Sequence, residues 1–442
     1  MSYSDFVPKR MGLKLILGAA VLGLVACATG PTQAQTLTTL YNFTYGSDGG
    51  NPFSGLVADK QGNLYGLASY GGIQNCSNPP DGTGCGTVFE MTPSEGGWTF
   101  NLLYSFAGSP DAGIPDVESL IFDKRGNLYG TTQLGGAHGV GTVFELSPAE
   151  GGWTEKVLYN ICSASGCADG EEPFSSVALK NGSLYGATMA GGAHGSGTVF
   201  KLTPSKSGWT ETVLYSFCSA SGCTDGAIPG DMALIFDRQG NLYGTTYVGG
   251  AYGYGTVFEL VKTGKTTYAE KVLYSFTGGT DGGFPDARLL FDKSGNLYST
   301  TWIGGDLAGC NVAYYGCGVV FELTPPSGDS GAWTETVLHS FAGGADGDYP
   351  WAGLIFDSKG NLYGETSGYD PFTDSFFGYG TVFELTPSGG SWTEKVLHSF
   401  DWADGAEPIG GLILGKKGIL YGTAGQGGAY GYGTVFHLNS KK

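Results

Sequence analysis

One aspartate stands at the same place in each of seven short loops, most of which read Asp-Gly-x-x-Pro. The seven are Asp48, Asp111, Asp169, Asp225, Asp281, Asp346 and Asp404. Calcium prefers oxygen ligands, so these carboxylates predict a metal site, with calcium as the one cofactor to consider. The alternative is that each Asp caps a turn in which a following residue takes an unusual φ. One Asp per loop leaves the carboxylates far apart, and the turn needs no ion.

A second set of residues is aromatic and lies in Gly-rich loops that read GGAxGxG or a variant of it. Its members are Tyr70, Tyr252, Tyr254, Trp302, Tyr379, Tyr430 and Tyr432. Aromatic rings on an exposed acidic face can stack on sugar rings or anchor a protein partner. The set therefore predicts a surface for a polysaccharide or an envelope protein. The alternative is that the rings pack the Gly-rich loops against one another.

Both sets recur because the chain is a tandem repeat. A Leu-Tyr step marks each copy, followed by a VFEL-like run; its tyrosines are Tyr65, Tyr129, Tyr185, Tyr243, Tyr298, Tyr363 and Tyr421. The fourth copy contains four short β-type runs, at 234–237, 241–246, 255–260 and 269–276. Asp237 and Gly240 suit the hairpin turn between the first two runs. No apolar pattern has the period of a helix, so each copy predicts a four-stranded antiparallel meander.

Seven such meanders predict an all-β fold, a seven-bladed β-propeller of four-stranded antiparallel blades. A solenoid is the alternative, but it would need polar caps at its ends. Residues 36–43 match the fourth strand of a blade, and residues 433–438 match the third. Pairing these two segments would complete the last blade from both ends of the chain. The ring would then close without the open edges that promote aggregation.

The insertions and cysteines fall on one face of the predicted ring. The KxGN hairpins and the TPxxGGW connections share one face and vary little in length. The Gly-rich loops and the Asp-Gly loops share the other face, which also receives the main insertions, at 70–86, 302–318 and 367–380. Loops elaborated on a rigid frame often bind ligands, so this face is predicted to be the interacting one.

The sequence contains little that indicates catalysis. All five histidines replace another residue at a repeated position, which argues against a unique acid–base site. GxSxG, HExxH and P-loop motifs do not occur. We therefore predict no catalytic residues and favour a non-catalytic binding module. A purely structural envelope protein and a propeller-type lyase or hydrolase with a site at the channel mouth are the alternatives.

The first 35 residues read as a signal peptide with a lipobox and a short tether, and residues 36–442 as a single propeller domain. A basic segment precedes an apolar run, 15–26, that is too short to span a membrane. The run ends in Leu-Val-Ala-Cys, which resembles the bacterial lipobox and predicts a lipid on Cys27. The alternative is cleavage after Ala34, which would leave a periplasmic or extracellular protein. Both predict export, and the lipid would be the only membrane attachment.

Cysteine usage and charge agree with export. Eight of the nine cysteines form close pairs in sequence and predict four disulfides: Cys76 with Cys85, Cys162 with Cys167, Cys218 with Cys223, and Cys310 with Cys317. Zinc is the weaker alternative, because it would need two such pairs in register. The net charge is −18, and no basic stripe exists, so nucleic acid is not an expected partner. A monomer is expected.

Several motifs recur in a fixed order: GNLYGTT, GGAxGxGTVFELTP, GGWTEKVLYSF and DGxxP. Together they resemble the GloVer tandem repeat of bacterial "choice-of-anchor" proteins, over residues 36–438. The resemblance implies an exported or surface repeat protein of unknown biochemical function, anchored differently in different members. Some copies depart from the motif, as in NGSLYGAT (181–188), NLYSTT (296–301) and GILYGTA (418–424).

Overall fold

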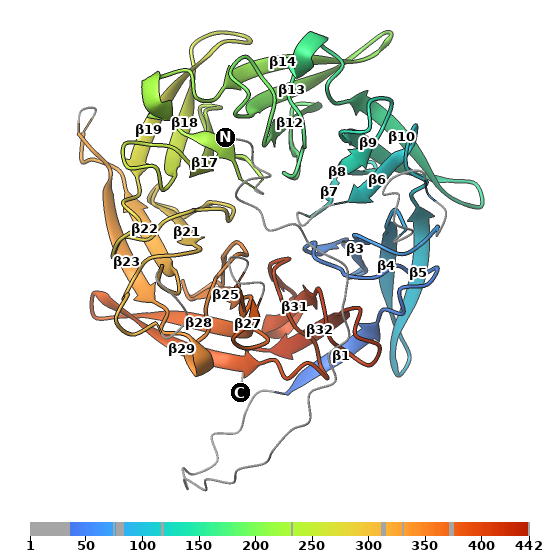
Figure 1. Cartoon of the computed structure of the whole chain (residues 1–442). Coiled ribbons are helices and arrows are strands. Elements are labelled where there is room, and N and C mark those ends of the chain that lie inside the picture. The colour runs from blue at the N-terminus through green and yellow to red at the C-terminus, as the bar shows by residue number, and fades with distance from the viewer. Residues whose placement is uncertain are drawn as a thin grey trace, which may run out of the picture.

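The computed structural model describes residues 36–440 except 74–75, 77–83, 116–118, 231–232, 311–314, 329–330 and 371–374. These residues form seven four-stranded antiparallel blades arranged in a ring (Figure 1), which confirms the predicted fold class. They contain no α-helix, and none of their helical turns is long and apolar enough to cross a membrane. The predicted leader and Cys27 lie outside the described residues.

Each blade runs from a short inner strand to a long outer strand. The first three blades are β2(Val57–Ala58), β3(Leu64–Ala68), β4(Thr87–Ser94), β5(Gly97–Ser105); β7(Ile121–Phe122), β8(Leu128–Gly135), β9(Thr142–Ala149), β10(Gly152–Asn160); and β11(Ala178–Lys180), β12(Ser183–Thr188), β13(Thr198–Ser205), β14(Gly208–Ser216). Blades 4 and 5 are β16(Ile235–Phe236), β17(Leu242–Val248), β18(Thr256–Lys262), β19(Tyr268–Ser275); and β20(Leu290–Phe291), β21(Leu297–Thr301), β22(Val319–Thr324), β23(Thr334–Ser340). Blades 6 and 7 are β24(Ile355–Phe356), β25(Leu362–Thr366), β28(Thr381–Ser388), β29(Ser391–Ser399); and β30(Ile413–Leu414), β31(Ile419–Ala424), β32(Thr434–Asn439), β1(Leu37–Asn42).

Three additions decorate this frame. β6(Ala112–Pro115) and β15(Ala227–Pro229) extend the sheets of blades 2 and 4, and each pairs with the second strand of its blade. β26(Tyr369–Asp370) pairs with β27(Ser375–Phe376) within the insertion of blade 6. All three lie in the Asp-Gly or Gly-rich loops, so the additions follow the predicted division between the two faces.

The ring closes as predicted. β1, from the N-terminal end of the described chain, pairs antiparallel with β32, with Leu37 opposite Leu438 and Asn42 opposite Thr434. Figure 1 shows β1 beside β32 at the outer edge of the last blade. Blade 7 is therefore built from both ends of the described chain, and β32 has no open edge.

The hairpin between the first two strands of a blade is fixed by an Asp and an Asn. In blade 4 the Asp237 carboxylate accepts hydrogen bonds from the backbone N–H groups of Gly240 and Asn241, at 2.6 and 2.8 Å. It also accepts one from the Asn241 side chain at 2.8 Å. Gly240 has a φ of +94°, which a residue with a side chain adopts only at a cost. The same Asp–Asn contact recurs in five blades, which explains why this hairpin hardly varies.

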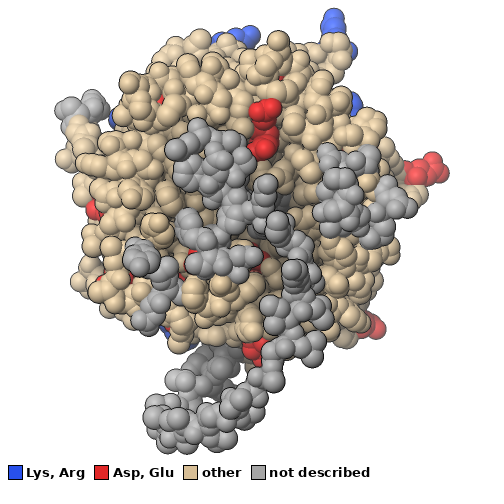
Figure 2. Space-filling view, viewed as in Figure 1, with Lys and Arg blue, Asp and Glu red and all other residues tan. Residues whose placement is uncertain are grey.

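Charge is divided unequally between the two faces. We define the loop face as the residues of the Gly-rich and Asp-Gly loops: 43–54, 69–86, 106–118, 133–141, 161–176, 189–197, 217–232, 247–255, 276–287, 302–318, 341–352, 367–380, 400–410 and 425–433. In sequence these segments contain 20 of the 40 acidic residues and none of the 22 lysines and arginines. In the view of Figure 2 the basic side chains appear only at the rim of the disc.

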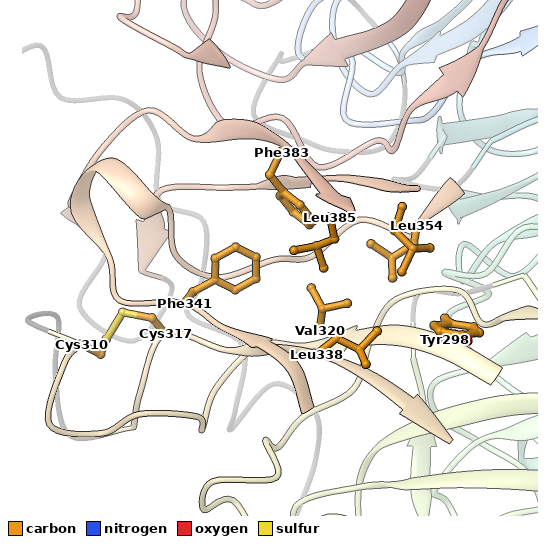
Figure 3. Packing of buried hydrophobic residues seen from close by; sticks show 10 residues of the cluster. Tyr298, Cys310, Cys317, Val320, Leu338, Phe341, Leu354, Phe383 and Leu385 are labelled. Carbon is orange, nitrogen blue, oxygen red and sulfur yellow. A yellow bond between two sulfur atoms is a disulfide. The ribbon is translucent and has the colours of Figure 1, made fainter. Parts of the chain in front are cut away.

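The hydrophobic core lies between blades rather than within them. A Phe at the end of one outer strand meets a Phe of the third strand of the next blade, edge to face. Phe341 of blade 5 and Phe383 of blade 6 have ring centroids 5.2 Å apart (Figure 3). Five other boundaries have the same contact at 5.1 to 5.2 Å, and at the boundary of blades 2 and 3 Ile161 takes the place of the first Phe.

The glycine of each Leu-Tyr-Gly step makes room for this packing. A Cβ on Gly364 would lie 2.5 Å from the Cζ atom of Phe383, so no side chain fits beneath the ring. Blade 5 has Ser299 at this place, and its hydroxyl donates a hydrogen bond to the Ala287 carbonyl at 3.0 Å. The repeat therefore requires a very small residue here, and NLYSTT is the one copy that uses serine.

Candidate functional site

The two loop types of the loop face hold neighbouring blades together. The residue before each Asp-Gly loop proline has a left-handed backbone, with φ between 52° and 56°; these residues are Asn51, Ile114, Glu172, Ile228, Phe284, Tyr349 and Glu407. The N–H of Phe284 donates to the carbonyl of Tyr254 in the preceding blade at 2.9 Å, and five other boundaries show the same bond. The loop face is thus built on a hydrogen-bonded ring of backbone.

The seven predicted Asp residues lie one per blade boundary, in these loops. In blade 4 the Asp225 carboxylate accepts hydrogen bonds from the Tyr215 hydroxyl at 2.7 Å and from the backbone N–H of Ser219 at 2.8 Å. Asp48, Asp111, Asp169 and Asp281 accept equivalent bonds from a tyrosine and a backbone N–H. These contacts correspond to the turn-capping alternative, and calcium binding stays a prediction.

Two histidines replace the tyrosine in this contact. His339 lies 3.3 Å from Asp346, and His398 lies 2.7 Å from Asp404. Burial opposes ionisation of both carboxyls, but hydrogen bonds from the histidines and from backbone N–H groups outweigh it and lower the pKa of Asp346 and Asp404. These histidines therefore serve the same contact as tyrosine, as expected for variants of a repeated position.

The predicted aromatic residues differ widely in exposure. Tyr252 and Tyr430 are 62% and 61% exposed, and Tyr379 is 38% exposed. Tyr70, Tyr254 and Tyr432 are half-buried. Trp302 is buried and packs edge to face on Trp351, with ring centroids 4.0 Å apart. The structure therefore does not bring the seven into one surface, because Trp302 packs between loops.

The four predicted disulfides are confirmed: Cys76–Cys85, Cys162–Cys167, Cys218–Cys223 and Cys310–Cys317. They indicate an oxidising, exported location. Among the described residues, one group of three potential metal ligands lies close together: Cys162, Cys167 and Glu171. Two of its members are already joined as a disulfide, so the cysteines staple loops instead of presenting thiolates to zinc.

A cavity of about 400 Å³ lies at the centre of the ring, between the first strands of the blades. One repeated position lines it with small residues: Gly55, Ser119, Ser176, Ala233, Gly353 and Gly411. At this position the remaining blade, blade 5, carries Arg288, the one charged side chain that lines the cavity among the described residues. No group of acids or histidines converges there in the described part of the chain.

The repeated sequence motifs point to one repeat family. The family model described as the Gloeobacter/Verrucomicrobia repeat matches residues 30–234 and 232–442. The chain belongs to this repeat family. The match confirms the resemblance drawn from the motifs.

No curated protein matches this Gloeobacter/Verrucomicrobia repeat protein. Among solved structures it is similar to a protein of unknown function from Dyadobacter fermentans, with 11% identity, a TM-score of 0.44, and coverage of 92% of this chain and 99% of the other. It is also similar to a putative oxidoreductase (glucose dehydrogenase) from Thermus thermophilus, with 15% identity, a TM-score of 0.41, and coverage of 72% and 95%.

One acidic residue of the repeat protein stands at a position where several other copies of the repeat have threonine. Glu365 of β25 stands where blades 2, 4 and 7 have Thr131, Thr245 and Thr423, each of which donates a hydrogen bond to a carbonyl of the next blade at 2.7 to 2.8 Å. Glu365 is fully buried; its Oε2 accepts a hydrogen bond from Gly411 at 3.0 Å, and its Oε1 has no partner. Burial raises its pKa to about 8.

A second group of acids repeats across blade boundaries. In five blades of the repeat protein a glutamate stands opposite the last residue of the VFEL run: Glu155, Glu211, Glu270, Glu335 and Glu394. In each, Oε1 is buried without a hydrogen-bond partner. Burial, and then the charge of the Asp at the preceding boundary, raises the pKa of Glu155 to about 8 and of the other four to about 7.

Each of these glutamates interacts with an aspartate across a blade boundary, and we call the two residues a carboxyl pair. Burial, Asp111 and Glu155 all raise the pKa of Tyr104, so one tyrosine and two carboxyls meet between blades 1 and 2. The motif WTEKVLY contains the glutamate, but only the contact between blades shows that it faces an acid. Two boundaries lack the pair, because Phe100 and Leu37 occupy the equivalent register positions.

We expect Glu365→Thr to stabilise the protein, and more so at pH 8.5 than at pH 5. Folded Glu365 has a raised pKa, so its contribution to the free energy of unfolding is present below about pH 4.5 and is lost as the pH rises through about 8. Threonine removes the buried carboxyl, and the expected increase in the free energy of unfolding at pH 8.5 is on the order of 1–3 kcal/mol. Urea unfolding curves at both pH values measure it. The reverse change at an equivalent position, Thr131→Glu, should destabilise; equal effects at both pH values would contradict the assignment.

We expect the thermal unfolding temperature to fall between pH 5 and pH 8.5, and the fall to shrink when the five glutamates are replaced by glutamine. A carboxyl with a raised folded pKa stabilises in its protonated form, and this stability disappears as the pH passes through 7 to 8. Calorimetry across this pH range checks it. Glu95→Gln with Glu150→Gln, two exposed acids, is the control. An unchanged slope in the fivefold variant would show that these five carboxyls do not titrate between pH 5 and pH 8.5.

Proposed function

We propose that this protein is an exported cell-envelope repeat protein whose loop face binds a polysaccharide or protein ligand without catalysing a reaction. The difference between the two faces carries the proposal. The loop face holds all four disulfides and the long insertions, and its segments lack basic residues. The opposite face consists of short hairpins, several of them held by the same Asp–Asn contact.

The described parts of the loop face are suited to binding because several contacts fix their conformation. Disulfides staple loops on this face, and backbone hydrogen bonds tie the loops to the neighbouring blade. A ligand that meets an ordered surface does not bear the entropy cost of ordering it. Exposed aromatic side chains, such as those of Tyr252 and Tyr430, then supply apolar area in contact with solvent. Exposed rings on one face favour a ligand-binding role over a purely structural one.

We expect the protein to bind at least one glycan of an array or one purified envelope protein, and to do so through the loop face. Replacing Tyr252 and Tyr430 together by alanine should weaken binding at least about tenfold, since exposed aromatic anchors carry much of the energy of an interface. Leu414→Ala is the control, because Leu414 is 39% exposed and ends the first strand of blade 7 outside the loop face. Isothermal titration calorimetry gives the dissociation constants.

The absence of any ligand would favour the purely structural alternative. Equal loss of affinity in the Tyr252/Tyr430 variant and in Leu414→Ala would place the binding surface elsewhere. Release of a shortened or unsaturated product during incubation with the ligand would favour the lyase or hydrolase alternative.

We further propose that a lipid on Cys27 holds the mature protein at the envelope, as the Leu-Val-Ala-Cys sequence suggests. Cys27 is the one cysteine outside the four disulfides, so it is not needed to staple a loop. We expect Cys27→Ser to move the protein from the membrane fraction to the soluble fraction and to abolish incorporation of labelled palmitate. Wild-type protein found only in the soluble fraction would support cleavage after Ala34.

A further inference from the structure

Four aromatic side chains gather on the loop face where blades 6 and 7 meet. We define the aromatic patch as Phe376, Phe377, Tyr379 and Trp402, which are 36%, 43%, 38% and 36% exposed. The ring centroids of Phe376, Tyr379 and Trp402 lie 5.5 to 6.1 Å from one another. Tyr369 supports the patch, with its ring 5.1 Å from that of Phe376. Contiguous exposed aromatic rings of this kind mark interaction sites more often than isolated ones do.

Trp402 holds its place at a conformational cost. Its φ is +71°, and the equivalent residues before the Asp of three other blades are glycines, Gly108, Gly278 and Gly343, with φ of 73° to 79°. A bulky residue in this left-handed region is strained, and such strain tends to persist where a side chain serves a function. Blade 1 has Tyr45 at the same position, with a φ of +62°, so an aromatic residue is found in this conformation twice. Glycine fits this backbone without strain, so Trp402→Gly removes the ring and keeps the loop conformation accessible.

The backbone beneath the patch is fixed by hydrogen bonds from three loops. Phe377 donates its N–H to the Gly368 carbonyl at 2.9 Å, and Glu407 donates to the Tyr379 carbonyl at 3.1 Å. Gly428 donates to the Trp402 carbonyl at 2.7 Å, which joins the patch to the loop that carries the exposed Tyr430. The rings therefore form a pre-organised surface, and a further exposed ring stands on the adjoining loop.

Charge and ring orientation narrow the chemistry of the ligand. The loop-face segments have no lysine or arginine, and the exposed Asp401 precedes Trp402, so an acidic glycan would be repelled. A neutral pyranose chain has apolar C–H faces that stack on aromatic rings and hydroxyls that donate to carboxylates and tyrosine oxygens. The rings of the patch are tilted by 46° to 85° to one another, which suits a twisted single chain and not the flat surface of a crystalline polymer.

We propose that the aromatic patch is the binding site for a single chain of a neutral polysaccharide, which stacks on Trp402 and Tyr379 and extends toward Tyr430. This inference rests on the proposed function of the loop face and assigns a location and a ligand class to it. A protein partner is not favoured, because the patch is a small set of tilted rings. In the described part of the adjoining Gly-rich loop of blade 7, Tyr430 is the one further large hydrophobic residue that is exposed.

The test compares Trp402→Gly and Tyr379→Ser with a control outside the loop face, Leu414→Ala. A further variant, Tyr252→His, lies elsewhere on the loop face and shows whether binding occurs there instead. Glycine and serine are the residues that other blades carry at the first two positions, as in Gly343 and Ser196, so both variants should fold; histidine occupies the position of Tyr252 in blades 2 and 3. Titration calorimetry with cellohexaose, xylohexaose and mannohexaose as neutral probes, and with hexagalacturonate as the acidic one, measures binding. Thermal unfolding of each variant confirms that it is folded.

The proposal predicts that at least one neutral hexasaccharide binds wild-type protein and that hexagalacturonate does not. Trp402→Gly should raise the dissociation constant at least tenfold while its unfolding temperature stays equal or rises, and Leu414→Ala, outside the loop face, should change binding less than twofold. If Tyr252→His loses affinity and Trp402→Gly does not, the patch is the wrong site although the loop face still binds. If no neutral hexasaccharide binds wild-type protein, this proposal fails. The proposed function is then tested separately, by binding to purified envelope proteins.

Discussion

The edge-to-face contact between phenylalanines of neighbouring blades is the interaction on which the rest of the fold depends. A four-stranded blade is one sheet layer, so it buries its faces only against the next blade. Phe341 and Phe383 show how this happens, and in six of the seven blades a glycine of the second strand leaves room for the phenylalanine ring of the third strand. Because every blade needs a neighbour on both sides, an open chain of seven would leave two apolar faces in water. The pairing of β1 with β32 removes that cost by closing the ring.

Much of this could be predicted from the sequence because the signals are local and repeated. The four runs of each copy, the Asp237 turn and the role of residues 36–43 depend on neighbours in the chain or on the comparison of one copy with another. The close cysteine pairs were also predictable, since a short loop leaves few possible partners.

The candidate site was predicted less well, for two physical reasons. A repeat pattern predicts functional residues at positions that recur in every copy. The aromatic patch consists partly of residues found in one copy only, Phe376, Phe377 and Trp402. Exposure of a Gly-rich loop residue also depends on the packing of neighbouring loops, so Tyr252 is exposed and Trp302 is buried although both lie in equivalent loops. Contacts across blade boundaries, such as that of Glu155 with Asp111, join residues whose relation only the assembled ring reveals.

The two boundaries without a carboxyl pair lie on either side of the strand that closes the ring. Both involve β1, the strand that joins the last blade without following its other three strands in the chain. On one side Leu37 takes the place of the glutamate, and on the other Phe100 does, with its ring stacked on Tyr41 at 4.3 Å. A paired carboxyl stabilises a boundary only while it holds a proton. In the other six blades the outer strand follows the third strand directly in the chain, whereas β1 does not follow β32. Strand β1 continues in the chain into blade 1, and it is held in blade 7 by non-covalent contacts alone. An apolar boundary on each of its sides therefore keeps ring closure independent of the titration of those glutamates.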